Sequence, residues 1–125
     1  MTRSDPLPRL RKICLALPGV TEKVSHGSPS WFARGDKGMF VSFVGEHHGE
    51  RLGFWCAAPP GVQEEMVAED PDRFFRPPYV GHRGWLGVYL DRAVDWAEIT
   101  EIADQSFRVV ATKKSIAELD ARGGA

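Results

Sequence analysis

Between residues 30 and 57 the chain places three strand-like segments so close together that only hairpins can join them. Residues 30–34, 38–44 and 52–57 are rich in aromatic and β-branched side chains, as strands are. A short turn around Gly35 joins the first two, and a polar loop over 45–50 joins the second to the third. A parallel crossover needs about a dozen residues or more, so these links predict antiparallel pairing. Residues 85–90 have the same strand-like composition and predict a fourth strand.

Helical patterns lie on either side of these strands. Leu7, Leu10, Cys14 and Leu17 recur at spacings of three and four, which predicts a helix that Ser4 or Asp5 caps and that the pair 18–19, Pro-Gly, ends. Residues 62–69 indicate a short helix, and residues 95–112 indicate the clearest one.

The last of these helices carries its own start signal. Asp95 followed by Glu98 resembles a capping box, and acidic residues precede basic ones along the segment, in the order that suits the helix dipole. The sequence therefore predicts an α+β fold, in which N- and C-terminal helices cover one face of an antiparallel sheet. We expect a single domain over 1–125, frayed at 1–5 and 115–125, with at most one helical turn after residue 115.

The charge balance limits the classes of partner. Sixteen Lys and Arg nearly cancel 17 Asp and Glu, giving a net charge of −1, which argues against sequence-blind binding of polyanions. The total conceals a basic segment over 1–23 and an acidic one over 58–79. Because no apolar run reaches the roughly 18 residues of a membrane span and the N-terminus lacks a signal-peptide pattern, we expect a cytoplasmic protein without a membrane partner. Cys14 and Cys56 are expected to be reduced and buried.

Aromatic side chains alternate along the predicted strands in a way that suggests a binding surface. If the helices cover the aliphatic face, then Trp31, Trp55, Trp85 and Tyr89 share the other face, with glycines leaving shallow hollows between them. Such a surface could stack bases or hold a flat small-molecule ligand. The alternative is that the segment 58–84 covers these rings and that they are ordinary core.

Motifs for catalysis and metal binding are not found in the sequence. It contains no nucleophile elbow, phosphate-binding glycine loop or dinucleotide fingerprint. The histidines, His26 and His82 among them, have no metal-ligand spacing. We therefore predict no catalytic residue, no metal site and no cofactor, and expect a protein that is not an enzyme.

Four blocks of the sequence together resemble one known family. They are Leu-Ala-Leu-Pro-Gly-Val-Thr-Glu at 15–22, His-Gly-Ser-Pro-Ser-Trp-Phe at 26–32, the Gly-Trp strand within 79–91, and the helix over 95–111. In this order they are similar to the MmcQ/YjbR-like family, although Lys37-Gly38 stands where the family more often has Gly-Lys. The resemblance implies a CyaY-like (frataxin-like) two-layer sandwich and a DNA-binding protein of the "double-wing" type.

The resemblance also implies where DNA would be bound. By analogy the open sheet face and its hairpins would meet DNA, and the matching positions are Trp31, Arg34, Lys37, His82, Arg83 and Trp85. Two other functions remain open. One is small-ligand binding by the aromatic face (Trp31, Trp55, Trp85 and Tyr89), and the other is a protein-interaction module that could form a homodimer through the same face.

Overall fold

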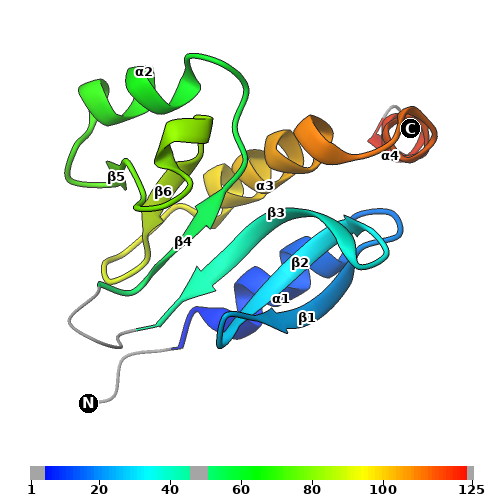
Figure 1. Ribbon diagram of the computed structural model, residues 1–125, viewed down its shortest axis with the longest axis horizontal. Helices are drawn as coiled ribbons and strands as arrows, with labels where there is room; N and C mark the ends of the chain where they lie inside the picture. Colours follow the sequence, from blue (N-terminus) through cyan, green and yellow to red (C-terminus); the bar gives the residue numbers. More distant parts are fainter. Residues whose placement is uncertain (1–4, 46–50, 124–125) are drawn as a thin grey trace.

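A computed structural model describes residues 5–45 and 51–123 of the chain, and Figure 1 shows their arrangement. The elements in chain order are α1 Leu7–Leu15, β1 Thr21–Ser25, β2 Ser28–Arg34, β3 Lys37–Val44, β4 Gly53–Cys56, α2 Val62–Glu69, β5 Phe74–Phe75, the 3-10 turn η1 Gly81–Arg83, β6 Leu86–Tyr89, α3 Trp96–Val110 and α4 Lys113–Gly123.

The strands form one six-stranded sheet in the order β1-β2-β3-β4-β6-β5, in which every neighbouring pair is antiparallel. The helices α1 and α3 lie behind the strands in the view of Figure 1 and cover one face of the sheet. The predicted α+β architecture is thus confirmed. The face that α1 and α3 leave uncovered is called the open face below.

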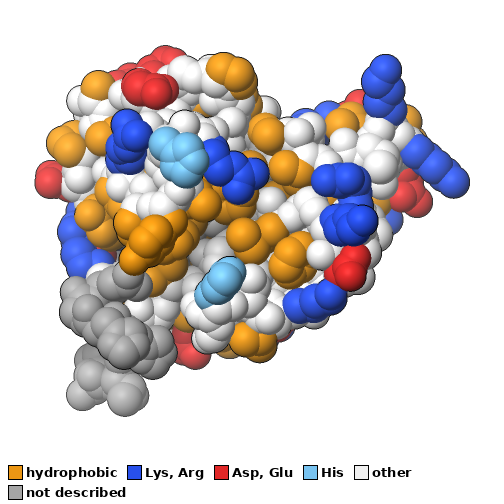
Figure 2. Space-filling view, viewed as in Figure 1, with side chains coloured by type: hydrophobic (Ala, Val, Ile, Leu, Met, Phe, Trp, Pro, Cys, Tyr) orange, Lys and Arg blue, Asp and Glu red, His pale blue; other side chains and the backbone are white. Residues whose placement is uncertain are grey.

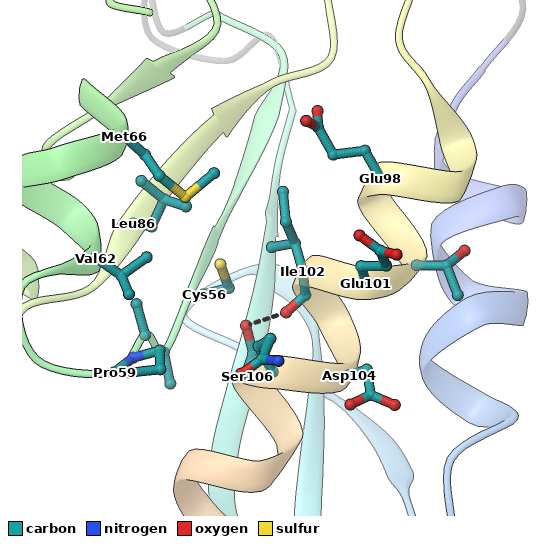
Figure 3. A pocket seen from close by; sticks show the side chains of 14 residues that line it. Cys56, Pro59, Val62, Met66, Leu86, Glu98, Glu101, Ile102, Asp104 and Ser106 are labelled. Carbon is teal, nitrogen blue, oxygen red and sulfur yellow. Dashed lines mark hydrogen bonds between the residues drawn. The ribbon is translucent and has the colours of Figure 1, made fainter. Parts of the chain in front are cut away.

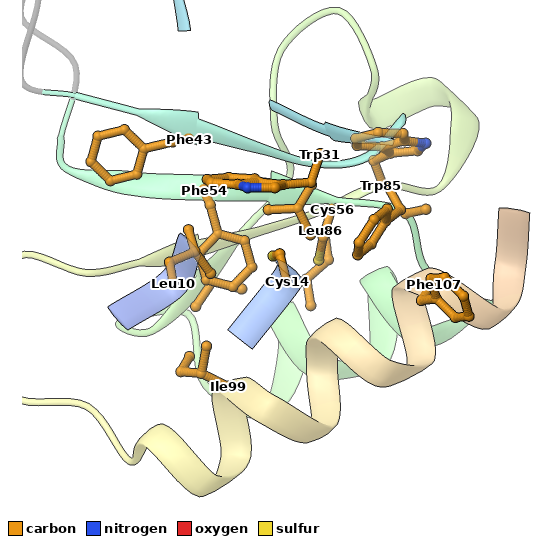
Figure 4. Packing of buried hydrophobic residues seen from close by; sticks show 14 of the residues in the cluster. Leu10, Cys14, Trp31, Phe43, Phe54, Cys56, Trp85, Leu86, Ile99 and Phe107 are labelled. Carbon is orange, nitrogen blue, oxygen red and sulfur yellow. The ribbon is translucent and has the colours of Figure 1, made fainter. Parts of the chain in front are cut away.

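The main core fills the space between the sheet and the two covering helices. Leu10 and Cys14 of α1 and Ile99 of α3 are buried against the inward side chains of the strands (Figure 4). Phe40 and Phe107 meet edge to face with ring centroids 5.7 Å apart, which ties β3 to α3. Burial of this apolar surface holds the helix layer on the sheet.

The start of α3 follows its sequence signal. Asp95 accepts a hydrogen bond from the Ala97 N–H at 2.9 Å, as an N-cap does. Glu98 forms an ion pair with Arg73, which links α3 to the segment before β5. The N-cap of α1 is Pro6 rather than the expected Asp5, although Asp5 accepts a hydrogen bond from the Leu7 N–H at 3.0 Å; Ser4, the other expected cap, is outside the described residues.

Three elements differ from the sequence prediction. β1 and β5 were not predicted, and α4 runs over 11 residues rather than one turn. The α4 helix is held by tertiary contacts, because Arg122 donates to the Ala16 carbonyl at 2.9 Å and Asp120 pairs with Arg108 at 2.7 Å. Within the described ranges, no helix is both long enough and apolar enough to span a membrane.

Candidate functional site

The charged side chains that the described strands place on the open face are all basic. They are Lys23 of β1, Arg34 of β2 and Lys37 of β3. Side chains along a strand alternate between the two faces, and neighbours of these residues such as Ala33 point inward and are buried in the core. Arg34 and Lys37 are cross-strand partners on either side of a two-residue turn, and both are exposed. These three residues are called the basic hairpin below.

The acidic residue of the strands lies on the other face. Glu22 is the cross-strand partner of Trp31 and accepts hydrogen bonds from Arg11 of α1, at 2.8 Å for the closest pair. In the basic hairpin, Lys23 lies 3.6 Å from Asp36 in an exposed pair, which contributes little net attraction. The hairpin therefore presents a net positive charge on the open face.

Beside the basic hairpin the open face is hollowed. A cavity of about 640 Å³ lies between the strands and the segment 79–85. Figure 2 shows hydrophobic side chains along this hollow and Lys and Arg side chains on two sides of it, with one acidic side chain among those on the right. Its lining residues are Ser25, His26, Ser28, Met39, Ser42, Val44, Trp55, Tyr79, Val80, Arg83 and Trp85.

A buried glutamine on α2 positions one wall of the hollow. Gln63 is 2% exposed, and its amide donates to the carbonyl oxygens of Gly81, at 2.9 Å, and of Trp85. These bonds anchor the start of the η1 turn and the residue two positions after its end. Arg83 of this turn places its guanidinium carbon 5.6 Å from the centre of the Trp85 ring. The wall is thus held by satisfied buried hydrogen bonds rather than by surface contacts.

Tyr79 stands at the edge of the hollow in an unusual conformation. Its φ is +66°, and a hydrogen bond from the Val80 N–H to the Pro78 carbonyl, at 2.7 Å, closes a three-residue turn around it. A positive φ makes this the rarer, strained form of the γ-turn. The side chain is 84% exposed, and its ring centroid lies 6.5 Å from that of Trp55. A strained backbone that holds a large ring in solvent is typical of binding sites.

Sequence reasoning did not single out Tyr79 as a site residue. The signal available was weak: two prolines precede it, which suggest a turn but do not specify a positive φ or an exposed ring. Gln63 was also missed, because a single glutamine in a short helix gives no sign that it will be buried.

Of the predicted site residues, Trp31 was wrongly placed on the open face. It is fully buried on the helix side, where its Nε1–H donates to Glu22 Oε1 at 2.9 Å. The register explains this: Trp31 lies opposite Val41, which in turn lies opposite Cys56, and both are inward-facing core residues. Phe32 takes the open-face position instead, with the Lys23 ammonium 5.8 Å from its ring centre.

The other predicted aromatic residues lie on the open face but are unequally accessible. Trp55 is half-buried and Trp85 is 4% exposed, and both line the hollow. Tyr89 lies outside it, stacked on Phe75 at 4.5 Å and covered by the Arg51 guanidinium, whose carbon is 3.6 Å from the ring centre. The segment 58–84 therefore covers part of this aromatic face, as the alternative reading expected.

The expected hollows over the strand glycines are wrong as well. A Cβ at Gly87 would come within 2.4 Å of the Phe75 ring, and one at Gly53 within 2.4 Å of the Val88 carbonyl oxygen. Both glycines allow close packing rather than leaving space. Of the predicted basic residues, Arg34, Lys37, His82 and Arg83 are all exposed.

A second groove of about 590 Å³ lies between α2 and α3, and Figure 3 shows it closely. Met66, Leu86 and Ile102 give it an apolar lining, and Glu101 is among the acidic side chains around it. Cys56 also lines the groove, but burial raises the pKa of its thiol to about 12, so the sulfur stays protonated and is a poor nucleophile at neutral pH.

Two further groups near the core, the Ser106 hydroxyl and the Cys14 thiol, are also poor nucleophiles. Ser106 donates back to the Ile102 carbonyl at 2.8 Å. Burial also raises the pKa of Cys14, which is a free thiol like Cys56. Among residues 5–45 and 51–123, no cluster of three or more His, Cys, Asp or Glu side chains could hold a metal ion.

An antiparallel sheet with one helix-covered face and one basic, hollowed face defines the class as an α+β two-layer protein with an open sheet surface. Comparison with protein families adds the particular relationship: the model of the family described as YjbR matches residues 15–109. The chain belongs to the YjbR family. Neither the comparison with curated proteins nor the one with solved structures gave a match.

Proposed function

We propose that this protein binds DNA through the open face of its sheet. The observation that carries the proposal is the separation of charge between the two faces of the sheet. On the open face the charged side chains of the described strands are Lys23, Arg34 and Lys37, whereas Glu22 points toward α1 on the other face. Arg83 adds a further exposed cation at the opposite wall of the hollow. Phosphate contacts by such side chains supply most of the affinity in sequence-independent DNA binding.

The net charge of −1 is compatible with this proposal, because in the described part of the chain, apart from Asp36 in the hairpin turn, the exposed acidic residues lie outside the strands of the open face. Exposed Glu64, Glu65 and Glu69 lie on α2, and exposed Glu101 lies on α3. A binding face is defined by its local potential rather than by the total charge of the chain.

The test is the salt dependence of affinity for a labelled DNA duplex and for a labelled single strand, measured by fluorescence anisotropy. We expect log Kd to rise linearly with log salt, and Arg34→Ala or Lys37→Ala each to reduce that slope by roughly 0.9 on a duplex or 0.7 on a single strand. Lys12→Ala is the matched control, since Lys12 is an exposed cation on α1, which covers the other face. The proposal is wrong if neither DNA binds at low salt, or if the control lowers the slope as much as the hairpin variants do.

A further inference from the structure

The hollow beside the basic hairpin has a shape and lining that a phosphate-binding surface alone does not need. Its volume of about 640 Å³ lies within the roughly 300–1,000 Å³ typical of sites for small organic groups. Trp55 and Trp85 line it, and the exposed Tyr79 ring stands at its edge. Phosphates are bound by cations and N–H groups, so these aromatic rings indicate a flat, apolar group.

We propose that the hollow receives an unpaired base of single-stranded nucleic acid. The inference rests on the proposed function and specifies which form of nucleic acid the open face prefers. The base would stack on Tyr79 and contact Trp55, whose ring is tilted 48° from that of Tyr79, while Arg83 in the wall of the hollow and the basic hairpin hold the neighbouring phosphates.

The argument for an unpaired base comes from access. In a duplex both faces of each base are covered by its neighbours in the stack, so a ring can reach a base face only when the base is unstacked. Trp85 is 4% exposed and Trp55 is half-buried, which means that only a group entering the hollow can contact them. A duplex resting on the surface would not bring a base face against either ring.

Polar groups in the hollow suit the edge of a base. The hydroxyls of Ser25, Ser28 and Ser42 line it, and each hydroxyl can donate or accept a hydrogen bond. Ser42 already shares a hydrogen bond of 3.0 Å with the buried Ser30, so it is held in place within the sheet. Groups that both donate and accept favour tolerance of different bases over strict sequence readout.

Charge complementarity favours a nucleic acid over an apolar ligand or a second copy of this chain. An apolar occupant would make no use of Arg83 or of the exposed Arg34 and Lys37, while a nucleic-acid strand supplies a phosphate on each side of the inserted base. A second copy would bring its own basic hairpin against this one in a two-fold contact, and like charges would repel.

The experiment compares three labelled ligands of equal length by anisotropy: a thymidine oligonucleotide, the same strand with an abasic site at its centre, and its duplex. We expect the intact single strand to bind more tightly than either of the others. Free thymidine monophosphate serves as the fourth arm, and it should bind far more weakly than the oligonucleotide.

The variants isolate stacking from charge. Tyr79→Ala is expected to weaken binding of the single strand by about 5- to 150-fold, the range for loss of one base-stacking ring, and to leave the salt slope unchanged. Tyr79→Phe should restore the affinity, because the ring remains. Val24→Ala is the control, since Val24 is a 74% exposed apolar side chain on β1 that does not line the hollow.

The outcomes separate this inference from the proposed function. If the duplex binds as tightly as the single strand and Tyr79→Ala has no effect, the hollow does not receive a base, whereas DNA binding by the open face stands. If no nucleic acid binds at low salt, both proposals fail. If free nucleotide binds as tightly as the oligonucleotide, or if sedimentation shows that a dimer occludes the face, the inference of a single-strand site is overturned.

Discussion

Glu22 offers the sharpest test of how the helix layer is attached to the sheet. Its carboxylate accepts the Trp31 Nε1–H at 2.9 Å and receives Arg11 Nε and Nη2 at 2.8–3.1 Å. The Trp31 ring is fully buried, while the side chains of Glu22 and Arg11 are 25% and 39% exposed. One carboxylate thus serves a buried neutral donor and a partly solvated cation.

The two functions of this carboxylate differ in energy, and two substitutions separate them. Glu22→Gln keeps an amide oxygen for the indole N–H and loses only the ion pair, which at this exposure is worth about 0.2–1 kcal/mol. Glu22→Ala also leaves the buried N–H without its acceptor, at a cost of about 1–3 kcal/mol. We therefore expect the alanine variant to be less stable than the glutamine variant by about 1–3 kcal/mol.

Equilibrium urea denaturation measures this difference directly. With an m-value of about 1–3 kcal/mol per molar, the two variants should differ in midpoint by on the order of 1 M. Arg11→Ala is the control and should behave like Glu22→Gln, because it removes the ion pair but not the acceptor. Equal midpoints for Glu22→Ala and Glu22→Gln would refute the reasoning, since the indole N–H would then need no protein acceptor.

Three further predictions concern backbone strain, close packing and charge. At position 79, the Tyr79→Gly variant should be more stable than Tyr79→Ala by about 1 kcal/mol in urea denaturation. The positive φ strains alanine by roughly 1–2 kcal/mol, whereas glycine loses only about 0.5–1 kcal/mol in chain entropy. The reverse order of stability would show that the turn is unstrained. Gly87→Ala should cost about 1–3 kcal/mol by displacing the Phe75 ring, and a wild-type midpoint would contradict this packing. The hydrogen bond from Arg51 lowers the pKa of Asp91. The stability that this pair contributes is therefore full above the ordinary Asp pKa of about 3.9, and it is lost as the pH falls through the lowered pKa of Asp91. Asp91→Asn should therefore be less stable than wild type at pH 7 but approach it in acid, and a gap independent of pH would be inconsistent with this pairing.

The predicted elements were those in which local pattern and tertiary structure agree. The hairpins followed from link length, which leaves no other pairing, and α3 followed from an Asp95 cap and a continuous apolar stripe. β1 was missed because its sequence, Thr-Glu-Lys-Val-Ser, has neither alternation nor an apolar run. It is an edge strand that pairs on one side and is largely exposed, so its partner rather than its composition makes it a strand.

The placement of Trp31 shows a different limit of the sequence. Alternation states which side chains share a face, but it does not state which face the helices will cover. The pairing of β2 with β3 decides which face Trp31 takes. The register shifts between Trp31 and Phe32 of β2, because β3 has a bulge with Phe40 as its extra residue, and Phe40 and Val41 are therefore both buried. No residue type in the segment signals this bulge, and a one-residue shift exchanges Trp31 for Phe32 on the open face.

The charge of the chain also has to be assigned to faces before it informs function. The helix layer is one helix thick, about 10–12 Å, and the screening length is about 10 Å in 0.1 M salt. A nucleic-acid strand bound at the basic hairpin is therefore screened from exposed acidic side chains of the helix layer on the opposite face, such as Glu101. In 0.01 M salt the screening length rises to about 30 Å, so the acidic side chains of the far layer offset part of the attraction, although binding at the basic hairpin is still tightest at low salt. The low net charge of the chain thus limits long-range attraction of nucleic acid but does not weaken the contact with the basic hairpin. This favours a nucleic acid that is held in one orientation on the open face over one that is attracted to the whole surface.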